Sequence, residues 1–266
     1  MNRIITALDF NEPGKARALV ERLDPSLTRL KIGNQLYTLA GPALVEECQK
    51  AGFDVFLDLK YHDIPNTVAS AIEAAAGMGV WMVNVHASGG PAMLQAARNA
   101  VEQYDRHAEH GGGTRLIAVT VLTSLDRDEL ISVGLDVEPV DQVSRLATLA
   151  RQAGLDGVVC SPHEVSQIRA IAKNNFLAVT PGVRPDQASS APVGNISSHG
   201  GRPDDQRRTL TPFDAILAGS DYLVIGRPIT QAQSPVDVLH ALNAEVQIAA
   251  SQLTATKPAN TADIDA

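Results

Sequence analysis

Cysteine is scarce in this chain of 266 residues, with Cys48 and Cys160 as the only two. They lie far apart in the sequence, and neither belongs to a CxxC pair or to a His-rich tract. This excludes a dense disulfide framework and the common zinc-ligand spacings. We interpret both as buried structural thiols in a reducing compartment.

The chain also lacks an excess of basic residues and any long apolar run. It has 22 Lys and Arg against 30 Asp and Glu, a formal net charge of −8, whereas nucleic-acid binders are usually basic. No apolar stretch is long enough to span a bilayer, and the N-terminus shows no signal-peptide pattern. We expect a soluble, cytoplasmic protein without nucleic-acid or membrane partners, although a local basic cluster could still bind a small anion.

Short apolar runs alternate along the chain with longer amphipathic ones. Hydrophobic residues make up 44% of the chain, enough for a sizeable core, and the apolar runs are typical of strands buried on both faces. The expected strands are 4–9, 29–32, 55–60, 82–86, 116–122, 157–160, 177–180 and 222–226. The expected helices are 13–23, 42–51, 67–78, 91–103, 141–153, 162–172, 211–218 and 235–248.

Eight such units of strand and helix predict an α/β fold, a closed (β/α)8 TIM barrel in a single domain over residues 1–253. The alternative is an open doubly wound sheet, which is weakened because no Gly-rich dinucleotide fingerprint follows the first strand. Two segments break the pattern. Residues 185–205 are rich in Ser, Gly and Pro and are typical of a lid, and residues 254–266 are small and polar, as in a flexible tail.

Polar side chains cluster where the expected strands end. In this barrel the carboxyl ends of the strands form the active-site face, so polar residues at most of the eight ends predict a site there. The residues are Asp9, Lys31, Asp58, Lys60, His86, Thr123, Arg184 and Arg227.

The densest charge cluster follows the third strand. Residues i and i+2 of a strand share a face, so Asp58 and Lys60 are expected to point the same way and Leu59 towards the helices. The following turn adds Asp63, which would place two carboxylates around one ammonium. A surface ion-pair network is the alternative, but these charges end an apolar strand, which favours a functional cluster.

Other candidate groups near these strand ends have simpler interpretations. His62 and His86 are better explained as hydrogen-bonded scaffold residues than as acid–base groups, and no His, Asp or Glu spacing demands a metal.

Two segments near the end of the chain are typical of a phosphate site. One is Thr180-Pro181-Gly182-Val183-Arg184, and the other contains Gly226 and Arg227. A glycine lets backbone N–H groups approach an anion, and an arginine can bind phosphate oxygens in a fork. Loops seven and eight of such barrels commonly hold phosphate. Alternatively, Gly226 only makes a tight turn and Arg227 is solvated.

Together these motifs closely resemble the bacterial type of the orotidine 5′-monophosphate decarboxylase family. They occur in the family's order from Asp9 to Pro228, and the string Asp-x-Lys-x-His-Asp-Ile-Pro-Asn-Thr is highly specific to it. The matching segments are 7–9, 31–33, 58–67, 85–90, 121–124, 180–184, 205–208 and 226–228.

The resemblance implies decarboxylation of orotidine 5′-monophosphate to UMP in de novo pyrimidine biosynthesis, without metal or organic cofactor. Lys60 would protonate C6 of the pyrimidine, within a charge network of Lys31 and Asp58. Asp63 would join that network from the neighbouring subunit of a homodimer with shared active sites.

The resemblance also implies the substrate contacts. Asp9 would bind the ribose, as would Thr67 of the neighbouring subunit, and Thr123 would hydrogen-bond the pyrimidine. The remaining implied substrate contacts are Lys31, Asp58 and Ile64, with Arg184, Gln206, Gly226 and Arg227 holding the phosphate. The stretch from Arg184 to Gln206, which would close over the phosphate, is longer than expected for the bacterial family.

Two other functions compete with this one. A metal-dependent phosphosugar enzyme on the same barrel, such as a 3-keto-gulonate-phosphate decarboxylase or a hexulose-phosphate synthase, would need acidic ligands at neighbouring strand ends. Here the second strand ends in Lys31, which opposes a cation site. A catalytically inactive nucleotide-binding module is the other alternative, but it would have no reason to keep Lys60 among carboxylates.

Overall fold

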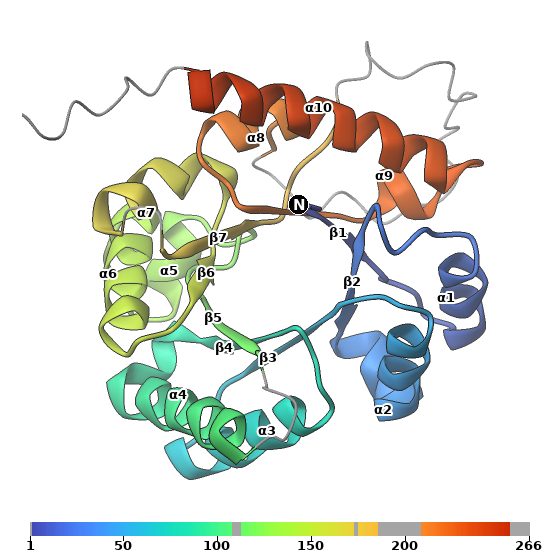
Figure 1. The fold of residues 1–266 in the computed structure, drawn as a ribbon. Helices are drawn as coiled ribbons and strands as arrows, with labels where there is room; N and C mark the ends of the chain where they lie inside the picture. The colour runs from blue at the N-terminus through green and yellow to red at the C-terminus, as the bar shows by residue number, and fades with distance from the viewer. Residues whose placement is uncertain (1, 108–112, 173–174, 186–208, 256–266) are drawn as a thin grey trace, which may run out of the picture.

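A closed barrel of eight parallel strands, ordered β1 to β8, forms the centre of the molecule in a computed structural model that describes residues 2–107, 113–172, 175–185 and 209–255. The helices form an outer ring around it (Figure 1). The strands are β1 (Ile4–Ala7), β2 (Arg29–Gly33), β3 (Val55–Tyr61), β4 (Met82–His86), β5 (Arg115–Val119), β6 (Gly157–Val159), β7 (Leu177–Thr180) and β8 (Tyr222–Ile225).

The helices follow the strands along the chain. They are α1 (Pro13–Val20), α2 (Asn34–Lys50), α3 (Pro65–Gly77), α4 (Gly90–His107), α5 (Arg127–Ser132), α6 (Pro139–Gln152), α7 (Val165–Ile171), α8 (Pro212–Leu217), α9 (Arg227–Thr230) and α10 (Pro235–Ala255), with short 3-10 turns η1 (Ala87–Gly89) and η2 (Pro162–Glu164). The predicted barrel is confirmed, because near-continuous apolar runs are buried on both faces when strands are enclosed by helices.

The element boundaries differ from the expectation in places. The sequence predicts a helix only from residue 42, whereas α2 begins at Asn34 and is interrupted by a kink at Gly41, which has a φ of 63°. Glycine tolerates this left-handed conformation, and Pro42 restarts the helix. The short helices α5 and α9 were not predicted, and β5 ends at Val119 instead of residue 122.

The core has two layers. The larger lies between the strands and the helices, and Leu59 packs against it, as predicted. The smaller fills the barrel interior with Ile5, Phe56, Met82, Ile117, Val179 and Tyr222. At the amino-terminal ends of the strands Trp81 packs edge-on against Tyr222, and the Arg29 guanidinium lies 4.4 Å from the centroid of the Trp81 ring. The barrel is therefore plugged at this end, and the polar strand ends lie at the other.

The two irregular segments lie largely beyond the described residues. Of the expected lid at 185–205 only Pro185 is described, and of the expected tail at 254–266 only the last residues of α10. Within the part of the chain that the structure describes, no helix is long and apolar enough to cross a membrane.

Candidate active site

Four charged side chains from three neighbouring strands meet at the carboxyl end of the barrel. Lys31 lies on β2, Asp58 and Lys60 lie on β3, and Asp9 follows β1. Lys31 Nζ lies 3.1 Å from Asp58 Oδ2 and 3.3 Å from Asp9 Oδ1, and Lys60 Nζ lies 2.7 Å from Asp58 Oδ1. Ammonium and carboxylate groups therefore alternate in the order Asp9, Lys31, Asp58, Lys60. The strand-end pattern predicts that these residues lie together.

The two inner members of this network, Lys31 and Asp58, are buried, and each holds the other in its charged form. Burial by itself would lower the pKa of the Lys31 ammonium, but Asp58 and Asp9 outweigh burial and hold that pKa above its ordinary value. Burial would raise the pKa of the Asp58 carboxyl, but Lys31 and Lys60, with hydrogen bonds from Lys60 and Asn84, keep that pKa below its ordinary value. Near neutral pH both groups are therefore charged.

Lys60 has a strained backbone. Its φ is 51°, and it is the one non-glycine residue with positive φ in the described part of the chain. The pairing of β3 with β4 shifts its register between Leu57 and Tyr61, so Lys60 sits in a bulge. Asp58 and Lys60 do point the same way, as predicted. The predicted reason was the regular alternation of a strand, whereas the strand is irregular at Lys60. The bulge re-aims Lys60, as bulges beside active sites often do.

Asn84 belongs to the site and was missed by the sequence analysis. Its Nδ2 donates a hydrogen bond of 2.7 Å to Asp58 Oδ1, and its Oδ1 accepts one of 2.8 Å from the Lys60 backbone N–H. Its side chain is fully buried in β4 between Val83 and Val85. A polar residue inside an otherwise apolar strand was the available indication.

Two glycines border the network. A Cβ at Gly33 would lie 3.3 Å from Lys31 Nζ, so a larger residue would press on that ammonium. A Cβ at Gly226 would lie 3.6 Å from Ala7 Cβ and 3.7 Å from Asp9 Oδ2, which are ordinary contact distances. Packing alone therefore does not require glycine at 226.

Asp63, Ile64 and Thr67 are exposed, at the end of the β3–α3 loop and the start of α3. The Asp63 carboxylate accepts a hydrogen bond of 2.6 Å from the Ile64 backbone N–H. No ion pair joins Asp63 to Lys60 among the residues that are described. The expectation that Asp58 and Asp63 of one chain both surround the Lys60 ammonium is therefore wrong. After the bulge the chain carries Asp63 to the surface.

The candidate phosphate ligands lie where loops leave β7 and β8, which pair side by side. Arg184 donates its backbone N–H to the carbonyl oxygen of Leu210 at 2.9 Å, which ties the two ends of the β7–α8 connection together. Arg227 is exposed as the first residue of α9. Gln206 lies outside the described residues, and Thr123 lies in a turn beyond the end of β5.

His62 and His86 lie next to each other, with ring centroids 5.5 Å apart. Burial lowers the pKa of the His86 imidazole, and His62 and Lys60 lower it further. His86 is therefore neutral near pH 7.

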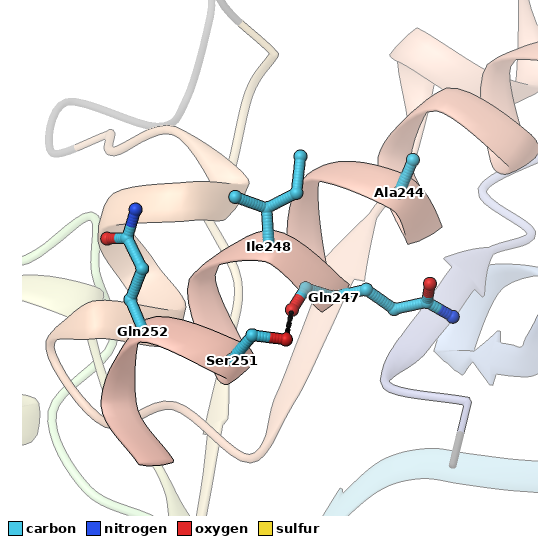
Figure 2. A pocket seen from close by; sticks show the side chains of 5 residues that line it. All are labelled: Ala244, Gln247, Ile248, Ser251 and Gln252. Atoms are coloured by element: carbon cyan, nitrogen blue, oxygen red, sulfur yellow. Dashed lines mark hydrogen bonds between the residues drawn. The ribbon is translucent and has the colours of Figure 1, made fainter. Parts of the chain in front are cut away.

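Two hollows can be compared as binding sites. One of about 230 Å³ is lined by the charge network and its neighbours Leu8, Asp9, Lys31, Gly33, Asn34, Gln35, Leu36, Asp58 and Lys60. A larger one of about 580 Å³ lies along one face of α10, where Figure 2 shows Ala244, Gln247, Ile248, Ser251 and Gln252. The larger hollow contains no charged or acid–base group. The smaller one, at the strand ends, is therefore the candidate active site.

Comparisons with known proteins show to which family this chain belongs. Residues 2–242 match the model of the "Orotidine 5'-phosphate decarboxylase / HUMPS family". Proteins named orotidine 5′-phosphate decarboxylase are 53% identical in Chromohalobacter salexigens (91% of this chain and 95% of the relative) and 54% identical in Nitrosospira multiformis (92% and 94%). The crystal structure of the enzyme of that name from Lactobacillus acidophilus has a TM-score of 0.78 at 32% identity, over 92% of this chain and 99% of that one. This chain therefore belongs to the orotidine 5′-phosphate decarboxylase / HUMPS family.

Proposed function

We propose that this protein decarboxylates orotidine 5′-monophosphate to UMP in de novo pyrimidine biosynthesis, with Lys60 as the proton donor to C6 and no metal or organic cofactor. The observation that carries the proposal is the Lys60 ammonium at the barrel mouth, held 2.7 Å from Asp58 in a network of alternating charge. The names of relatives more than 50% identical over most of the chain support the same substrate.

The chemistry requires stabilisation of a carbanion. When the bond between C6 and the carboxylate breaks, CO2 leaves and the electron pair stays on an sp2 carbon that is not conjugated with it. An ammonium beside C6 favours this charge in a site partly shielded from water, and then supplies the proton that forms the new C6–H bond. Lys60, left as the amine, regains a proton from solvent.

The other charges of the network keep Lys60 ready for this step. Asp58 draws the ammonium to one position, and Lys31 holds Asp58 from the opposite side. Because the pKa of Asp58 is lowered, the carboxylate does not take the proton that C6 needs. Positioning before the reaction is what makes such electrostatic stabilisation effective.

The substrate contacts proposed here are those that the family resemblance implies. Asp9 would bind the ribose, Thr123 the pyrimidine, and Arg184, Gln206, Gly226 and Arg227 the phosphate. Asp63, Ile64 and Thr67 would reach the site of the neighbouring subunit in a homodimer. Their exposure supports this assignment, because Ile64 is an apolar side chain that is 67% exposed in the single chain.

The position of Lys31 supports a reaction without metal. Its ammonium lies between the carboxylates of Asp9 and Asp58, where a divalent cation in a phosphosugar enzyme of this barrel would need to be. A cation bound there would face strong repulsion.

The test is a spectrophotometric assay for the loss of orotidylate absorbance, run on the full chain with EDTA present. We expect full activity. Activity lost on exhaustive chelation and restored by a divalent ion would contradict the reaction without metal and favour the phosphosugar enzyme. A folded chain that binds UMP without turning over orotidylate would be the inactive nucleotide-binding module.

A further inference from the structure

Asn84 is the one uncharged side chain whose polar atoms bond both Asp58 and Lys60 in the described part of the chain. Its amide is fully buried in the middle of β4. A buried amide destabilises the fold unless its hydrogen bonds are made. An apolar residue at this position of the strand would avoid that penalty.

The orientation of the amide follows from its two partners. The ionised Asp58 carboxylate can only accept a hydrogen bond, and the Lys60 backbone N–H can only donate one. Nδ2 therefore faces Asp58 at 2.7 Å, and Oδ1 faces the Lys60 N–H at 2.8 Å. One side chain thus fixes both a carboxylate and the backbone of the residue that it pairs with.

The bulge in β3 explains why a side chain is needed here. The register of β3 with β4 shifts between Leu57 and Tyr61, so the regular ladder is interrupted at Lys60. Asn84 satisfies the freed Lys60 N–H and holds that residue at its positive φ. A strained backbone persists only where surrounding contacts over-determine it.

We propose that Asn84 is a positioning residue for the decarboxylation, which keeps Asp58 and the strained backbone of Lys60 in the arrangement that aims the Lys60 ammonium at C6. This inference rests on the proposed function. Asn84 acts only through Asp58 and Lys60. Its loss should therefore affect turnover far more than the binding of nucleotide by its phosphate and ribose.

The first experiment compares Asn84→Ala with wild type in kcat and KM for orotidylate and in the dissociation constant for UMP. The variant loses one hydrogen bond to a charged group and one to the backbone. We expect kcat to fall by at least about 10-fold, the lower end for a single charged hydrogen bond. We expect UMP affinity to change by less than about 3-fold.

Thr6→Val is the matched control. Thr6 is also fully buried in a barrel strand, and its hydroxyl is hydrogen-bonded at 2.8 Å to Thr28, with no contact to the charge network. We expect it to lower the free energy of unfolding and to leave kcat within about 3-fold of wild type.

Asn84→Asp supplies a second readout in a variant of nearly the same shape. The new carboxylate can still accept a hydrogen bond from the Lys60 N–H. It has no N–H group to donate to Asp58, so the two carboxylates repel each other unless they share one proton. As pH rises the pair loses that proton and repels, so the ratio of variant to wild-type kcat should fall with increasing pH. The titratable groups around this pair are Asp9, Lys31, Lys60, His62 and His86.

Three results would overturn the inference while the wild type is active on orotidylate. They are an Asn84→Ala kcat within 3-fold of wild type, equal losses of kcat and UMP affinity, and a pH-independent Asn84→Asp ratio. If Asn84→Ala does not fold, the pH dependence of Asn84→Asp decides alone. A wild type without activity would instead refute the proposed function, so the two failures are distinguishable.

Discussion

Variants of Lys60 can separate its chemistry from its strained backbone. Lys60→Ala removes the ammonium and leaves Asp58 bonded to Lys31 and Asn84, so the chain should stay folded. A unit charge developing about 4 Å from an ammonium is stabilised by about 4 kcal/mol at an effective dielectric constant of 20. That energy corresponds to roughly 10³-fold in rate, and general acid catalysis adds about 10²–10⁴-fold.

We therefore expect Lys60→Ala to lower kcat by roughly 10⁵-fold or more in the orotidylate absorbance assay. Lys50→Ala is the control, because Lys50 is an exposed lysine paired with Glu46 at 2.7 Å. It is the last residue of the outer helix α2, whereas the first residues of that helix line the site. Lys50→Ala should keep the wild-type rate. A folded Lys60→Ala protein with a tenth of the wild-type kcat would refute the role of Lys60.

Lys60→Gly tests the strain. Both variants lose the ion pair with Asp58, but only glycine adopts a φ of 51° without steric cost. The left-handed region costs other residues about 1–2 kcal/mol, part of which is offset by the greater chain entropy of unfolded glycine. Urea denaturation should therefore show Lys60→Gly about 1 kcal/mol more stable than Lys60→Ala, and both inactive. Equal stability, or a more stable alanine variant, would refute the strain.

Three further predictions concern packing, phosphate and the dimer. Gly157→Ala would press a Cβ against the carbonyl oxygen of Leu177 in β7 and should lower the free energy of unfolding by about 1–3 kcal/mol. Gly14→Ala, with open space around it in α1, should raise that free energy by about 0.5–1 kcal/mol. Urea denaturation measures both, and changes of the same sign would contradict this account of the packing. Arg227→Ala should lower kcat/KM for orotidylate by about 10–150-fold and leave the phosphate-free nucleoside nearly unaffected, while equal losses would show that Arg227 supports only the fold. Mixed Lys60→Ala and Asp63→Ala chains should recover some activity, because one hybrid site regains both residues, and no recovery despite measured subunit exchange would count against shared sites.

Much of the fold follows from short-range pattern. Apolar runs of four to seven residues alternating with amphipathic segments predicted eight strands, and each is found within a few residues of its expected place. The first half of α2 was missed because Gly41 and Pro42 are typical of a break, and here they only kink a helix that has already begun. Closure of the barrel then brings the strand ends together, so Asp9, Lys31, Asp58 and Lys60 could be chosen as neighbours from the sequence.

The details that aim these groups depend on contacts between strands. Asn84 bonds to Asp58 across 26 residues of sequence, and the bulge that it supports appears only when β3 is paired with β4. The positive φ of Lys60 has the same origin, because Lys60 lies in that bulge. The sequence by itself determined the alternation of elements and the charged residues, because periodicity and residue type are local. Only the tertiary structure decided the register and the hydrogen-bond partners, because these are set by which strands lie side by side.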